Sequence, residues 1–128
     1  MTYETDVRNG CDIRTSTARD WLRWCARKWL AKVERLRIGA LIRDSPRLGL
    51  LYCGRGSVLR QFLADLDALQ DLGEIRFHLY QASINYRHQS RSACCQEEGS
   101  LLKAKSSEAR RLFRATCLAD ALWSGGAS

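Results

Sequence analysis

Apolar side chains recur at helical spacing in three parts of the chain. The first part, 17–36, contains neither glycine nor proline, and Thr17 and Asp20 have the spacing of a capping box at its start. The side of this helix that we expect to be buried comprises Ala18, Leu22, Cys25, Ala26, Trp29 and Val33. A second helix is predicted from a Ser57 cap to Gly73, and a third covers 106–123.

Between these helices, apolar and polar residues alternate with the period of a β-strand. The segment 35–43 alternates, and the turn-forming residues 44–47 lead into 48–53, which is short and apolar. The two segments therefore predict a hairpin. The segment 74–88 reads as two further short strands on either side of a turn at Gln81.

The resulting order of elements predicts an α+β fold, in which helices flank a small, mainly antiparallel sheet. Gly54 and Gly56 separate the hairpin from the second helix, and 89–100 is polar enough to be a loop. The single domain is expected over 15–123. We expect residues 1–14 to form a flexible arm and 124–128 a disordered tail, and no internal repeat is evident.

Composition adds a strong basic excess, supplied mainly by arginine. The 128 residues carry a net charge of +7, and 17 of the 21 basic residues are arginine. The guanidinium group is a planar, forked donor that suits phosphate oxygens, so this composition favours nucleic acid as a partner. Codon bias or simple solubility would explain the same excess without a ligand.

Neither the cysteines nor the histidines predict a catalytic or metal site. The six cysteines include no CxxC pair, and Cys94 and Cys95 with His88 nearby match zinc spacing poorly, so we expect no metal and no cofactor. No apolar signal-peptide run is evident, which favours a reducing compartment. His78 and His88 are the histidines available as bases, and neither lies in a nucleophile motif. We therefore expect that the protein is not an enzyme and has no small-molecule substrate.

Two tryptophans stand out on the first predicted helix. Trp21 and Trp24 lie away from its apolar side and next to Lys28. A large aromatic surface in water tends to mark an interaction site, and a base stacked on such a ring contributes about 1–3 kcal/mol. The alternative is that the pair packs on another helix or on a partner subunit.

The outer face of the predicted sheet is the second candidate binding surface. Such a face could hold duplex RNA by its shape and phosphates without reading its sequence, or it could simply be solvated. Its basic residues are Arg35, Arg37, Arg43, Arg76 and Arg87, interleaved with Tyr80, Ser83 and Asn85.

These residues resemble the RNA-silencing suppressors of tombusviruses and their aureusvirus relatives. The resemblance depends on Trp21-Leu22-Arg23-Trp24, on Ile75-Arg76-Phe77 with Ser83-Ile84 following, and on a similar order of helices and strands across 16–123. It implies a homodimer in the host-cell cytoplasm that sequesters short duplex RNA. It also implies that Trp21 and Trp24 cap the duplex ends and that Arg76 and Ser83 contact the backbone.

Two other functions compete with RNA binding. A non-catalytic protein-interaction module would bury Trp21 and Trp24 against a host or viral protein, and its binding would depend little on salt. A basic amphipathic element on acidic membranes is disfavoured, because the exposed side of the first helix lacks a broad apolar stripe, and no segment is long enough to span a bilayer.

Overall fold

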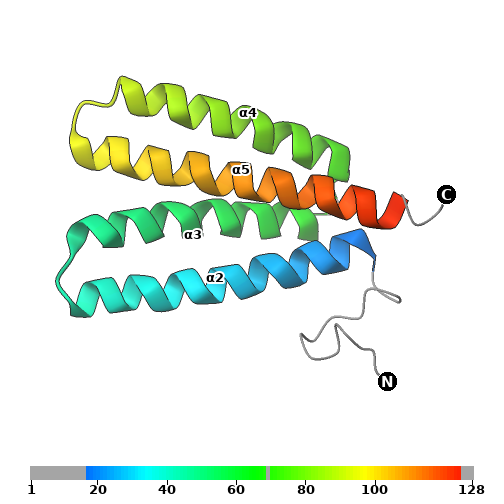
Figure 1. Ribbon diagram of the computed structural model, residues 1–128, viewed down its shortest axis with the longest axis horizontal. Helices are drawn as coiled ribbons and strands as arrows, with labels where there is room; N and C mark the ends of the chain where they lie inside the picture. The colour runs from blue at the N-terminus through cyan, green and yellow to red at the C-terminus, as the bar shows by residue number, and fades with distance from the viewer. Residues whose placement is uncertain (1–16, 69, 125–128) are drawn as a thin grey trace.

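The computed structural model describes residues 17–68 and 70–124, and these residues form an antiparallel succession of helices (Figure 1). Its elements are α2 (Ala18–Ile42), α3 (Pro46–Asp67), α4 (Leu72–Arg91) and α5 (Gln96–Ser124). No strand occurs in this part of the chain, so the predicted α+β fold is wrong. The predicted arm and residues 125–128 lie outside the described residues. None of the described helices is long and apolar enough to cross a membrane.

The predicted hairpin is helical because α2 continues through its first strand. Ala40 is buried, whereas Ile38 and Ile42 are exposed, Ile42 by 78% of its surface. The alternation of apolar and polar residues in 35–43 therefore reflects apolar side chains exposed to solvent and not one buried face of a strand. The predicted turn is correct in position, since Asp44 has a φ of 53° and Pro46 is the first residue of α3, but it joins two helices.

The glycines that we expected to break the chain lie inside α3. A Cβ atom on Gly54 would stand 3.0 Å from both the Cδ1 atom and the carbonyl oxygen of Leu101. Gly54 thus allows α3 and α5 to approach closely. From the sequence alone, a glycine at a close helix contact looks the same as a glycine in a turn. Ser57, predicted as a helix cap, is an exposed residue in the middle of α3.

The segment predicted as two strands forms α4. Its buried residues Ile75, Leu79 and Ser83 are four positions apart, which is helical spacing. The N-cap is Asp71, whose side chain accepts a hydrogen bond of 3.2 Å from the backbone N–H of Glu74. Gly73, expected to end the second helix, lies in the first turn of α4, and much of the expected 89–100 loop is helical.

The three helices recognised from periodicity are confirmed, although their ends differ. The capping box at Thr17 is present, with the hydroxyl accepting from the backbone N–H of Asp20 at 3.1 Å. Ala18 and Trp29 are only half-buried, although we expected both to be buried. The buried core includes Leu22, Ala26 and Val33 of α2, Val58, Leu59, Phe62 and Leu66 of α3, Ile75 and Leu79 of α4, and Ala109, Leu112 and Ala119 of α5.

The four helices form two hairpins, α2 with α3 and α4 with α5, that pack through the parallel helices α3 and α5 (Figure 1). α3 begins at Pro46 and α5 at Gln96, 50 positions later. The same spacing relates their buried residues, so the fold contains a structural repeat that we did not predict. The buried pairs are Gly54 and Ala104, Gly56 and Ser106, Val58 and Glu108, Leu59 and Ala109, Phe62 and Leu112, and Leu66 and Thr116.

Two glycine substitutions in α3 test this packing. Gly54→Ala should lower the free energy of unfolding by about 1–3 kcal/mol, because overpacking against the Leu101 backbone outweighs the gain of about 1 kcal/mol in helix propensity. Gly49→Ala is the matched control. It meets nothing within 4 Å and should raise the stability by about 0.5–1 kcal/mol. Urea unfolding followed by circular dichroism measures both, and equal stabilisation would contradict a close α3–α5 contact.

Candidate nucleic-acid interface

The outward side of α5 is basic along half of its length. Lys103, Ser107, Arg110 and Arg114 follow one another at intervals of four, three and four residues, so they fall within roughly 60° on one side of the helix. The opposite side of α5 buries Leu112, Thr116 and Ala119 against the other helices. Core packing therefore orients this row of cations toward solvent.

Arg87 of α4 joins these α5 side chains around an open groove of about 520 Å³. The lining residues are Arg87, Lys103, Ser106, Ser107, Arg110 and Arg114, and none of these described residues is acidic. We call this surface the α4–α5 groove. Four cations that face one space without a carboxylate repel one another, and an anion that enters relieves this repulsion.

Contacts between α4 and α5 fix the groove. The hydroxyl of Ser106 is buried and donates to the carbonyl oxygen of Ser83 at 2.7 Å. Tyr80 and Phe113 pack with ring centroids 5.5 Å apart. Because these contacts join the two helices over more than one turn, the cations stand on a rigid support.

The residues predicted to bind RNA do not form one surface. Of the predicted basic and polar residues on α4, only Arg87 lines the groove. Ser83 is only 5% exposed and donates to the carbonyl of Tyr80 at 2.8 Å, so its hydroxyl does not face solvent. Arg76 is half-buried, 3.7 Å from Asp120 and 3.5 Å from the carbonyl of Thr116.

The other predicted cations lie on α2. Lys28 and Arg35 are exposed opposite its buried side, and Arg43 is exposed at its C-cap. Arg37 is held by Glu34, which also pairs with Arg60. α2 thus carries a basic outer side of its own, on a different helix from the α4–α5 groove.

The tryptophan pair is less exposed than its sequence positions indicate. Trp21 packs against the core cluster and lies 5.9 Å from Trp123, centroid to centroid. Trp24 is half-buried, and the ammonium group of Lys28 lies 5.0 Å from its ring centroid. The sequence allows three interpretations of this pair: base stacking, packing on another helix, or packing on a partner subunit. For Trp21 the structure shows packing on another helix.

A buried carboxylate links α5 to α2 beside the basic row. Glu108 is only 2% exposed, and one of its oxygens accepts a hydrogen bond of 3.0 Å from Nε of Arg111 and lies 3.0 Å from Nη2 of the same guanidinium. The guanidinium of Arg111 in turn lies 4.2 Å from the ring centroid of Trp29. Burial raises the pKa of Glu108, although the charges of Arg111 and Arg55 act in the opposite direction.

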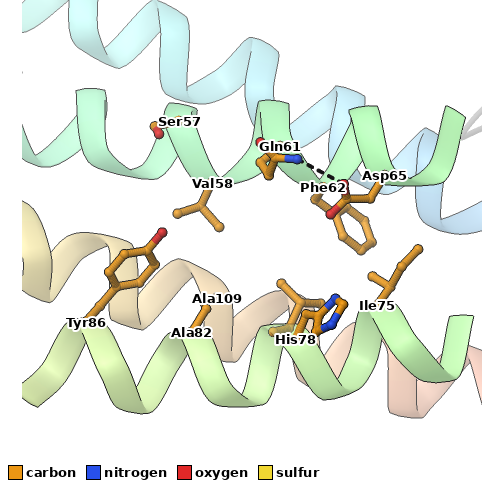
Figure 2. Close-up of a pocket in the computed structure, with 11 residues that line it drawn as sticks. Ser57, Val58, Gln61, Phe62, Asp65, Ile75, His78, Ala82, Tyr86 and Ala109 are labelled. Atoms are coloured by element: carbon orange, nitrogen blue, oxygen red, sulfur yellow. Dashed lines mark hydrogen bonds between the residues drawn. The ribbon is translucent and has the colours of Figure 1, made fainter. Parts of the chain in front are cut away.

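A separate cavity of about 200 Å³ lies between α3 and α4 (Figure 2). Ser57, Asp65 and His78 all line it, which are residue types used in nucleophilic catalysis. However, none of the hydrogen bonds of the described residues joins two of these three side chains. Asp65 instead accepts from the amide of Gln61 at 2.9 Å, as the dashed line in Figure 2 shows. The cavity therefore gives no support to a catalytic function.

Adjacent thiols meet a carboxylate at the start of α5. The Sγ atom of Cys94 lies 3.1 Å from Oε1 of Glu98, and the backbone N–H of Glu98 donates to Sγ of Cys95 at 3.4 Å. The carboxylate raises the pKa of the Cys94 thiol, and the thiol and the backbone N–H of Cys94 lower the pKa of Glu98. The sequence pattern indicated only His88 as a neighbour of these cysteines, and the structure adds Glu98.

Comparison of the chain with protein-family models, with curated protein sequences and with solved structures gives no match. The sequence patterns did not identify the groove residues of α5 as a binding surface. The spacing of Arg110 and Arg114 within the predicted last helix was a signal that could have identified them. Lys103 precedes the predicted start of that helix, so its place in the row depends on the structure.

The raised pKa of Glu108 predicts how stability depends on pH. The folded chain holds the Glu108 proton more tightly than the unfolded chain, so the contribution of Glu108 to the free energy of unfolding should fall as pH rises above the ordinary glutamate value of 4.5. Glu108→Gln removes this loss, and Glu97→Gln controls for removal of an exposed carboxylate. Urea unfolding at a series of pH values measures the effect. A constant difference between wild type and Glu108→Gln would contradict a burial cost at this site.

Proposed function

We propose that the protein binds nucleic acid, and short duplex RNA in particular, through the α4–α5 groove, as a sequestering protein and not a catalyst. The observation that carries the proposal is the convergence of Arg87, Lys103, Arg110 and Arg114 on one groove whose described lining contains no carboxylate. Arginine and lysine side chains supply sequence-independent affinity by neutralising phosphates and releasing counterions. Guanidinium groups can also bind phosphate oxygens through two parallel hydrogen bonds.

The form of the groove favours a duplex over a single strand. Proteins that bind single strands combine cations with aromatic rings on which bases stack, and the described lining of this groove contains no aromatic residue. Its α5 cations are also held at fixed intervals, since a rise of 1.5 Å per residue separates Lys103 from Arg110 by about 10 Å and Arg110 from Arg114 by about 6 Å along the axis. A rigid row of cations suits the regular phosphates of a duplex.

A hydroxyl among the cations supports RNA as the duplex. Ser107 is exposed, lines the groove and lies about one helical turn from both Lys103 and Arg110. Its hydroxyl can donate to or accept from a ribose 2′-hydroxyl, which DNA lacks. RNA in A-form presents 2′-hydroxyls in a wide, shallow minor groove, so contact does not require a projecting element.

The role implied by the suppressor resemblance requires only such a complex. Sequestration of short duplexes in the host-cell cytoplasm would suppress RNA silencing without chemistry, and a homodimer would present the groove twice. Only the sequence motifs of the resemblance still support this role. The similar order of helices and strands no longer does, because the described residues form helices alone. End capping by both tryptophans is also not supported, since Trp21 packs against Trp123.

A protein-interaction function remains the second candidate, on a different surface from the one we expected. Leu41 and Ile42 are exposed by 75% and 78%, next to an apolar groove between the end of α2 and the start of α3. Exposed apolar residues that cluster on one surface favour a protein partner. Binding there would respond little to salt and would not require the α5 arginines.

Fluorescence anisotropy with a short blunt RNA duplex tests the proposed function. Arg110→Gln with Arg114→Gln should weaken binding at least tenfold and reduce the slope of log affinity against log salt by about 1.5–2, because two phosphate contacts are lost. Arg27→Gln with Arg35→Gln is the matched control. It removes the same charge from exposed positions on α2 and should have a much smaller effect.

The same titration with single-stranded RNA and duplex DNA defines the ligand. We expect duplex RNA to bind most tightly of the three. Equal losses for the α5 and α2 variants would mean that net charge alone drives binding, and this would contradict the assignment to the α4–α5 groove. Equal affinity for all three nucleic acids would contradict the preference for duplex RNA.

A further inference from the structure

The turn between α4 and α5 brings two thiols and a carboxylate together in a defined arrangement. α4 ends at Arg91 and α5 begins at Gln96, so Cys94 and Cys95 immediately precede the first turn of α5. The backbone N–H of Glu98 donates to Sγ of Cys95 at 3.4 Å, as it would to the oxygen of a serine cap. The Glu98 carboxylate reaches back and accepts from the backbone N–H of Cys94 at 3.2 Å.

These contacts orient the sulfur and oxygen atoms toward one another. Sγ of Cys94, Sγ of Cys95 and one carboxylate oxygen of Glu98 all lie within 4.8 Å of one another. Zinc bonds of about 2.3 Å to sulfur and 2.0–2.2 Å to oxygen place tetrahedral ligand atoms about 3.5–3.8 Å apart. The three atoms are therefore close enough together for one tetrahedral ion to contact all of them.

We propose that Cys94, Cys95 and Glu98 bind a thiophilic divalent cation, Zn²⁺ by chemistry, as three ligands of a tetrahedral site whose fourth position is open to solvent. Thiolates select zinc over the oxygen-preferring Mg²⁺ and Ca²⁺. Exposure of all three ligands allows water or a further ligand to occupy the fourth position.

The surroundings of the site balance its charge. Two thiolates and a carboxylate around a divalent ion leave one net negative charge. Arg47 and Lys103 line the same surface depression as Cys94 and Cys95, and they supply positive charge near it. Lys103 also lines the α4–α5 groove, so the metal site adjoins the proposed RNA surface without depending on it.

Cobalt(II) is the probe for the site, because cobalt–thiolate bonds give a charge-transfer absorption. This absorption is lost when Zn²⁺ displaces the cobalt ion. We expect the reduced 128-residue chain, freed of metal with a chelator, to bind one cobalt ion per chain and to release it when Zn²⁺ is added. Cys94→Ser and Cys95→Ser should each weaken zinc binding at least tenfold, and Glu98→Gln should weaken it less while the thiolate absorption remains.

The exposed cysteines elsewhere in the chain provide matched controls. Cys53→Ser and Cys117→Ser each remove an exposed thiol and should leave affinity unchanged. All variants carry Cys11→Ser, so that this residue cannot supply a ligand, and circular dichroism verifies that each is folded. Three results would each overturn the proposal: no cobalt–thiolate absorption, zinc binding by the Cys94 or Cys95 variant as tight as that of the parent protein, or one ion shared between two chains.

Discussion

The close approach of α3 and α5 at Gly54 is the contact on which the rest of the structure depends. A Cβ atom at this position would stand 3.0 Å from the backbone of Leu101, so a larger residue would require the two hairpins to shift apart. This contact places α5 between α3 and α4, and α2 also reaches its flank. With these sides covered, one side of α5 remains in solvent, and it is the side that carries Lys103, Arg110 and Arg114.

The structural repeat allows equivalent buried positions of the two hairpins to be compared, and at one of them the residues differ in charge. Val58 of α3 packs in the apolar core, whereas its counterpart in α5 is the carboxylate of Glu108. A buried carboxylate costs free energy unless it is paired, and here it holds Arg111 against Trp29. The charge of Arg111 is therefore partly compensated, while Arg110 and Arg114 face the groove. Basic residues on the same helix thus differ in their availability to a ligand.

Sequence patterns predicted the long helices and most of their buried residues, because periodicity over many turns is a strong signal. They misassigned 35–43 and 74–88, where short apolar segments match a strand and a helix equally well. Ile38 and Ile42 alternate with arginines yet are exposed, and Ile75, Leu79 and Ser83 also have helical spacing. The pattern around Gly54 predicts a break, because Leu101, which contacts it, is distant in sequence. Arg87 was the groove residue that the sequence identified, but it was placed on a sheet that the described residues do not form. The sequence pattern did not identify Glu98 as the neighbour of Cys94.

The central claim is that duplex RNA binds in the α4–α5 groove. The most direct test is to follow the backbone amide resonances of the ¹⁵N-labelled protein while a short blunt RNA duplex is added. Our account predicts that the largest shifts cluster around Arg87 on α4 and from Lys103 to Arg114 on α5, with little change at the exposed end of α2 near Ile42. Shifts centred on the end of α2, or no shifts at all at moderate salt, would contradict it.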